Sequence, residues 1–141
     1  MLNKNFKLFA CAALCVVMLV GVNSCKKDDD RDPYEGSWKV VDKEDGKEFQ
    51  TYTVTITKSK ANKNDVILQG FFGEPTIGAI ATITGNSFTI PQQSFSFSNG
   101  MLGFSGSGRK EGNRLSYSMQ VTITSGGSVA LGTIQSEATK L

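Results

Sequence analysis

Apolar and polar side chains alternate along most of this chain with a period of two residues. Over 50–57, Tyr52, Val54 and Ile56 alternate with four threonines, and over 115–123 five apolar residues alternate with Ser, Gln and Thr. This period is typical of a strand with one buried and one solvated face, and threonine suits the solvated face. No window keeps an apolar stripe at helical spacing over three turns. The sequence therefore predicts an all-β domain.

Turn-forming residues divide the alternating segments into short strands. Asp45-Gly46 and Asn99-Gly100 are typical of tight hairpins, and the second pair suits a type I′ turn. The predicted strands cover 37–43, 47–58, 66–72, 77–84, 88–90 with 95–98, 101–109, 114–124 and 128–137. Pro91-Gln92-Gln93 leaves open whether the fifth element is one strand or two, because proline interrupts strand pairing.

About eight strands joined in sequence by tight turns predict a small antiparallel up-and-down barrel. Closure is favoured because it hides the edges that an open sheet would expose. Gly103, Gly106 and Gly108 within one predicted strand suit a barrel strand that bends sharply. A two-sheet β-sandwich is the alternative architecture, and the pattern does not exclude it.

The start of the chain predicts a secretory leader. Lys4 and Lys7 precede fifteen uncharged residues, 8–22, which are too few for a bilayer-spanning helix of about 20 residues but suit a signal peptide. The next residues, Val22-Asn23-Ser24-Cys25, resemble the lipobox of bacterial lipoproteins, which implies cleavage before Cys25 and acylation of that cysteine. The other two cysteines leave with the leader, so no disulfide is expected within the mature chain.

This resemblance divides the chain into a signal peptide over 1–24, an acylated cysteine with a charged tether over 25–33, and a domain over 34–141. Lys26-Lys27-Asp28-Asp29-Asp30 is similar to the charged export signal that follows the acylated cysteine in lipoproteins of Bacteroidota. The resemblance implies attachment to the outer membrane through lipid at Cys25, at the cell surface or on the periplasmic face. Several acyl chains anchor a protein firmly, because each buried methylene contributes about 0.8 kcal/mol.

Gly36-Ser37-Trp38 opens the first predicted strand and is similar to the Gly-x-Trp start of lipocalin-like barrels. With the lipobox, the tether and the strand pattern, the chain resembles the small lipocalin-like lipoproteins of Bacteroidota. That family places the tryptophan at the barrel floor, and the resemblance implies a small ligand. The second Thr-Asp-Tyr-type motif and the late arginine of the family are missing, which puts a ligand cavity in doubt.

Six aromatic residues are the candidates for ligand contacts on the inner face of the barrel. A place in the hydrophobic core is the simpler interpretation of each of them, and for Trp38 a core position at the floor is favoured. The candidates are Trp38, Tyr52, Phe72, Phe88, Phe104 and Tyr117.

Composition argues against catalysis and against nucleic-acid binding. The chain has no histidine, so no Ser-His-Asp or Cys-His nucleophile can form, and no Gly-x-Ser-x-Gly or nucleotide-binding glycine motif is present. We therefore expect no enzymatic activity, no cofactor and no metal. Removal of the leader leaves equal numbers of acidic and basic side chains, which is not the basic footprint of a nucleic-acid-binding protein.

Two functional hypotheses remain from the sequence. In the first, the barrel binds a small apolar or amphipathic molecule. In the second, the interior is packed solid and the protein is an interaction module for a protein or glycan partner, whose identity the sequence does not give. Interior volume separates the two hypotheses, because a ligand site typically needs about 300 Å³ or more.

Overall fold

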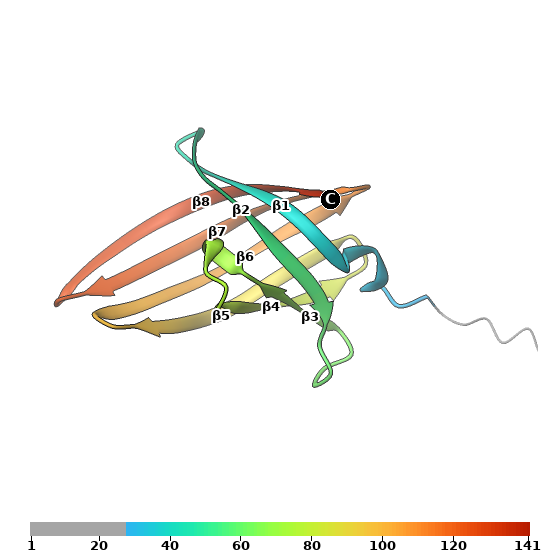
Figure 1. Ribbon diagram of the computed structural model, residues 1–141, viewed down its shortest axis with the longest axis horizontal. Coiled ribbons are helices and arrows are strands. Elements are labelled where there is room, and N and C mark those ends of the chain that lie inside the picture. The colour runs from blue at the N-terminus through green and yellow to red at the C-terminus, as the bar shows by residue number, and fades with distance from the viewer. Residues whose placement is uncertain (1–27) are drawn as a thin grey trace, which may run out of the picture.

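Eight antiparallel strands follow one another in chain order and close into a barrel (Figure 1). A computed structural model describes residues 28–141, so the predicted signal peptide over 1–24 and the lipidation site Cys25 lie outside the described residues. The elements are η1 (Asp32–Tyr34), β1 (Gly36–Glu44), β2 (Lys47–Lys58), β3 (Asp65–Gln69), η2 (Phe71–Gly73), β4 (Gly78–Thr84), β5 (Ser87–Phe97), β6 (Gly100–Glu111), β7 (Arg114–Ser125) and β8 (Ser128–Lys140). The predicted up-and-down barrel is confirmed, and the sandwich is excluded.

Two details of the strand prediction needed the structure. The fifth element is a single strand, β5, whose register with β6 shifts between Ile90 and Gln93, so the strand passes the proline through a bulge. The third predicted strand was too long. β3 ends at Gln69, because Gly70 adopts a left-handed conformation with φ 86° and turns the chain into η2.

One end of the barrel is closed where the described chain begins. Trp38 is fully buried there, and its indole Nε1 donates to the carbonyl oxygen of Tyr34 at 2.8 Å. The Tyr34 hydroxyl donates in turn to the carbonyl oxygen of Gly85 in the β4–β5 turn at 3.0 Å. The guanidinium of Arg31 donates to three carbonyl oxygens at the β2–β3 loop, so this part of the predicted tether packs against the barrel.

The 3-10 turn η2 seals the interior from the opposite end. Phe71 is fully buried, and its ring centroid lies 5.2 Å from that of Phe104 on β6. The ring of Phe72 lies 5.3 Å from the same partner, and Gln50 Nε2 holds the turn by donating to the Phe72 carbonyl oxygen at 2.6 Å. The connection between β3 and β4 therefore folds inward as a plug.

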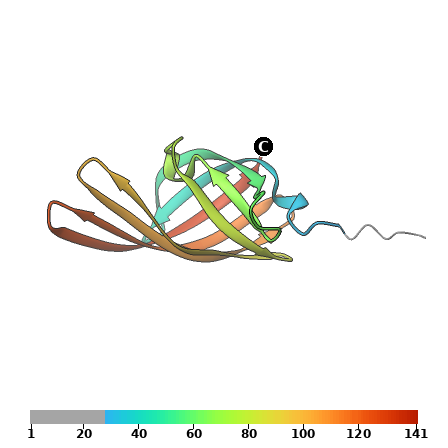
Figure 2. The ribbon, with the colours of Figure 1, turned by 90° about the horizontal axis from the view of Figure 1, so that it is seen from below.

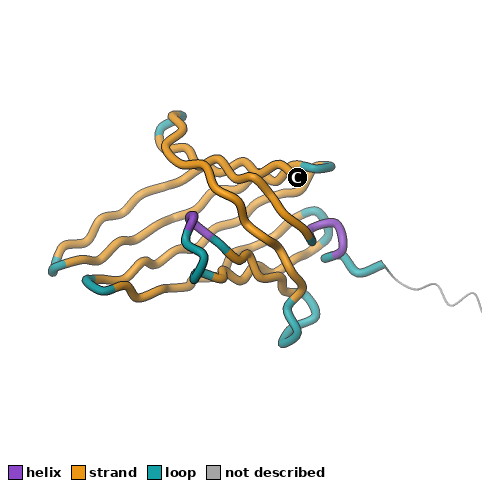
Figure 3. Tube along the Cα trace, viewed as in Figure 1, coloured by secondary structure: helices purple, strands orange, loops and turns teal. Residues whose placement is uncertain are grey.

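Four strands extend beyond the barrel at this second end. β4 pairs with β5 only as far as Thr89, and β1 pairs with β8 only as far as Gln135. Beyond these points β5 to β8 remain paired with one another and project as two long hairpins, on the left in Figure 2. We call the residues 91–104 and 121–134 the projecting sheet. Figure 3 shows that its strands are joined by short turns.

On the side of β6 that faces the interior, two successive inward positions, Gly106 and Gly108, carry no side chain. A Cβ on Gly108 would lie 2.4 Å from Tyr117 Cβ and 2.5 Å from Phe88 Cζ, and a Cβ on Gly106 would lie 2.3 Å from the carbonyl oxygen of Ser118. These distances are shorter than carbon contacts allow. Close packing against neighbouring side chains is therefore the structural reason for these two glycines.

Candidate functional site

The interior of the barrel is filled by its own side chains. Of the six predicted ligand contacts, Trp38, Tyr52, Phe88, Phe104 and Tyr117 are core residues that are at most 9% exposed, and Phe72 is partly buried. One space next to Phe88 has a volume of about 10 Å³. That volume holds no more than one water molecule. The ligand contacts of these six residues stay a prediction, and the packing favours the simpler interpretation that they form the core.

A buried polar cluster lies among these aromatic residues. Asp42 is fully buried, and the Ser136 hydroxyl donates to its Oδ1 at 2.5 Å. Within residues 28–141, the second oxygen of Asp42 and the hydroxyls of Tyr52 and Tyr117 have no hydrogen-bond partner. Burial raises the pKa of Asp42 and of both tyrosines. Sequence reasoning missed this carboxylate, although Asp42 continues the inward series of Trp38 and Val40.

The substitution Asp42→Asn is expected to stabilise the protein at neutral pH. Burial raises the pKa of the folded carboxyl above 3.8, so the folded state binds the proton more tightly than the unfolded state. The contribution of Asp42 to stability is therefore present below pH 3.8 and is lost as the pH rises to the folded pKa. Each unit of that rise costs about 1.4 kcal/mol, and an amide avoids this cost.

Urea unfolding between pH 4 and pH 7 measures this effect. The advantage of Asp42→Asn should shrink toward pH 4. The contrasting variant Ser136→Ala removes the hydroxyl that favours the ionised form, so its stability at pH 7 should fall below that of the unaltered protein. If the stability of Asp42→Asn had the same pH dependence as that of the unaltered protein, burial would not raise the pKa of this carboxyl.

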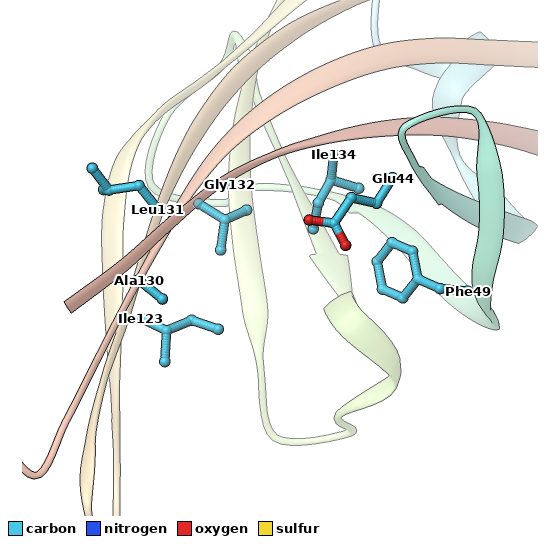
Figure 4. A pocket seen from close by; sticks show the side chains of 8 residues that line it. Glu44, Phe49, Ile123, Ala130, Leu131, Gly132 and Ile134 are labelled. Atoms are coloured by element: carbon cyan, nitrogen blue, oxygen red, sulfur yellow. The ribbon is translucent and has the colours of Figure 1, made fainter. Parts of the chain in front are cut away.

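A notch opens at the second end of the barrel, where β1 and β8 separate. Its volume is about 230 Å³. In Figure 4, Glu44 and Phe49 of the β1–β2 hairpin face Ile134, Gly132 and other residues of β8 across the gap. Among the described residues that line the notch, Glu44 is the one charged side chain. The lining residues are Glu44, Phe49, Val121, Ile123, Ala130, Leu131, Gly132 and Ile134.

The notch continues into the inner face of the projecting sheet, which is apolar. Phe95, Leu102 and Ile123 form one row of cross-strand partners, and the ring of Phe95 stacks on that of Phe104 at 5.8 Å. Phe97 and Ile123 are 47% and 44% exposed. We call Phe95, Phe97, Leu102, Ile123 and Ile134 the apolar inner face.

The projecting sheet also lacks charge. No charged side chain occurs between Glu74 and Arg109, or between Arg114 and Glu137. Its outer face carries further exposed apolar groups, with Leu131 80% exposed and Val129 63% exposed. An apolar surface of this kind is typical of an interaction site, because a solvated sheet usually bears charge. The absence of charged residues could have been found from the sequence. That these strands extend beyond the barrel, which exposes their uncharged surface, could not.

The described residues give no sign of a metal centre or of a membrane-crossing helix. Within 28–141 no three Asp, Glu or Cys side chains are grouped to hold a metal ion. In the same part of the chain, no helix has the length and apolar character that a bilayer span requires. Comparison of the chain with known proteins found no matching family model, no matching curated protein and no matching solved structure.

Proposed function

We propose that this protein is a non-enzymatic binding module, held at the outer membrane by lipid on Cys25, that binds an uncharged apolar surface of a protein partner. The observation that carries the proposal is the projecting sheet, which is uncharged and has exposed apolar side chains on both faces. The packed interior supports this choice over a ligand enclosed by the barrel, because five of the six inward aromatic candidates are core residues at most 9% exposed.

The position of the tether fits this role. The described chain begins beside η1 at the closed end, and the projecting sheet lies at the opposite end (Figure 2). A chain anchored through Cys25 would therefore carry its apolar inner face away from its own membrane, at the cell surface or in the periplasm. The lipocalin-like resemblance agrees with the barrel but gives no partner.

A small apolar or amphipathic ligand is the second candidate, and one observation favours it. The notch has a volume of about 230 Å³, and its described lining is apolar apart from Glu44 and the backbone. This volume is somewhat below the usual range for ligand sites, so the notch would hold part of a ligand or a small one. In this alternative the ligand lies at the mouth rather than inside the barrel.

The substitution Ile123→Asp tests both candidates, since it places a charge in the apolar inner face and in the lining of the notch. Cross-linking on intact cells should give a defined heteromeric product with the unaltered protein, and the charge should reduce it at least about tenfold, because an unpaired charge must be desolvated. The matched control is Ile80→Asp, on β4, an isoleucine of similar exposure (42%) that belongs neither to the apolar inner face nor to the lining of the notch.

Native mass spectrometry of the purified protein separates the two candidates. A retained small molecule that is lost in Ile123→Asp and kept in Ile80→Asp would establish ligand binding as the function, in place of binding to a protein partner. If Ile123→Asp and Ile80→Asp changed the yield of the cross-linked product equally, the result would contradict a role for the apolar inner face.

A further inference from the structure

Among residues 28–141, the projecting sheet has two edges without a neighbouring strand, and only one of them is protected. On β5, Pro91 and the adjacent bulge interrupt the edge. The side chain of Gln93 then ties this edge to β4, since its Nε2 donates to the Ile80 carbonyl oxygen and its Oε1 accepts from the Ile80 N–H, both at 2.8 Å. Proline and bulges are devices that prevent a strand edge from pairing with another chain.

The edge of β8 has none of these devices. Residues 128–134 contain no proline and no charged side chain, and their register with β7 is continuous. The edge is left open because β1 joins β8 only from Gln135, opposite Lys43. The same segment carries Val129 and Leu131, two of the most exposed apolar side chains of residues 28–141. A free, uncharged strand edge of this kind is a template for another strand.

The hydrogen-bonding groups of this edge can be assigned from the end of the strand. Lys140 donates its backbone N–H to the carbonyl oxygen of Asn113, on the β7 side, at 2.9 Å. Leu141 donates its N–H to the carbonyl oxygen of Ser37, on the β1 side, also at 2.9 Å. The direction alternates along a strand, so Val129, Leu131 and Thr133 turn their N–H and C=O groups toward the free edge.

We propose that this edge pairs antiparallel with the same edge of a second copy, with the two Leu131 residues opposite each other on a twofold axis. The free segment fits its own copy in length. It is bounded by the β7–β8 turn at one end and by the first residue paired with β1, Gln135, at the other. A second β8 centred on Leu131 therefore ends just before Gln135, the first residue of β8 that pairs with β1.

The pairing gives hydrogen-bond partners to the backbone N–H and C=O groups that the free edge exposes in each copy. Val129 of one copy lies opposite Thr133 of the other, and the three facing pairs exchange about six backbone hydrogen bonds. The two Leu131 side chains, each 80% exposed in the single chain, then contact each other across the axis. The paired segments bring no like charges of their own together, because the stretch between Arg114 and Glu137 is uncharged, and the nearest charge is Glu44, whose Oε1 lies 3.8 Å from the position of a Cβ on Gly132.

The dimer joins the two projecting sheets into one continuous sheet. Its strand-to-strand contact is smaller than a standard stable interface, so we expect a reversible dimer whose population depends on concentration. Attachment of both copies to one membrane would raise their effective concentration. This proposal does not depend on the proposed function, since the pairing uses the edge and the outer face and leaves the apolar inner face uncovered.

Cysteine cross-linking of the full chain in its membrane tests the twofold register. Oxidation of Leu131→Cys should give a reducible dimer at least about five times more abundant than that of Val129→Cys or of the unaltered chain. The two thiols introduced by Leu131→Cys would face each other within disulfide reach, whereas two residues at 129 lie about 13 Å apart along the strands. Equal yields from the two variants, or no dimer from Leu131→Cys, would overturn the proposal.

Sedimentation of the detergent-solubilised full chain gives an independent test. The unaltered chain should approach twice its monomer mass between about 1 µM and about 1 mM, and Leu131→Pro and Leu131→Lys should stay monomeric over that range. The proline removes an N–H that β7 does not use, so the barrel itself should remain folded. Ile80→Lys is the matched control and should still dimerise. A monomeric unaltered chain, or dimers in both Leu131 variants, would overturn the pairing.

Discussion

Replacing Gly108 with alanine is expected to destabilise the barrel by about 3 kcal/mol or more, a large part of the 5–15 kcal/mol that holds a typical domain folded. The new Cβ would lie 2.4 Å from Tyr117 Cβ, 2.5 Å from Phe88 Cζ and 2.6 Å from the carbonyl oxygen of Ser116. The first and last of these atoms belong to backbone or are fixed close to it. The clash therefore cannot be relieved by moving the end of a flexible side chain.

The neighbouring residue provides the control. Ser107 points to the outside of the same strand, and Ser107→Ala should change the free energy of unfolding by no more than about 0.5 kcal/mol. Denaturant unfolding followed by tryptophan fluorescence measures both variants, because the single tryptophan, Trp38, lies in the same core. A Gly108→Ala variant within about 1 kcal/mol of the unaltered protein would show that β6 does not approach Tyr117 and Phe88 so closely.

Replacing Cys25 with serine is expected to abolish the mature, acylated form of the protein completely. A serine offers no thiol for acylation, and the cleavage that the lipobox resemblance implies lies directly before this cysteine. Intact mass spectrometry should find a precursor of 15.2 kDa in the variant. In the unaltered protein it should find a chain that begins at Cys25 and carries the added mass of its acyl chains.

Cys15→Ser is the matched control for this experiment. That cysteine lies in the predicted leader, so its replacement should leave the mass of the mature protein and its membrane attachment unchanged. Detection of the same unacylated mass in the unaltered protein and in Cys25→Ser would contradict lipid attachment at Cys25. It would also contradict the membrane attachment in the proposed function, while the proposed binding surface would be unaffected.

Local pattern was sufficient to predict the strands and their order. The bounds of β2 agree with the prediction at both ends, because the Asp45-Gly46 turn precedes its start and alternation continues over 50–57. Tight turns such as Asp45-Gly46, both with positive φ, join neighbouring strands, so the meander and its closure followed from the spacing of the turns. The type I′ turn predicted at Asn99-Gly100 was wrong, because the turn lies at Ser98-Asn99 without positive φ and Gly100 already pairs with Phe97. The prediction ran past Gln69 because Phe71 and Phe72 have strand-like composition, whereas the plug they form depends on contacts with Phe104 across the barrel.

The candidate surface could not be predicted in the same way. Which residues of a strand lie inside a closed barrel depends on how far its neighbours extend, and β4 and β1 release β5 and β8 at Thr89 and Gln135. Phe104 and Ile123 share the inward face of the sheet, yet one is buried and the other is 44% exposed. Their alternation is identical, so only the pairing partners of the strands distinguish core from surface.

The seam between β1 and β8 also has a consequence for the order of folding. Every other pair of strands in the barrel is made by neighbours in the chain, but the seam joins Trp38 to Lys140, about a hundred residues apart. Hairpins between neighbours form on the microsecond scale, whereas a contact this distant must overcome the entropy of closing a long loop. Closure of the seam is therefore the expected rate-limiting step. Until it occurs, the chain is an open sheet whose first and last strands can still pair with other molecules.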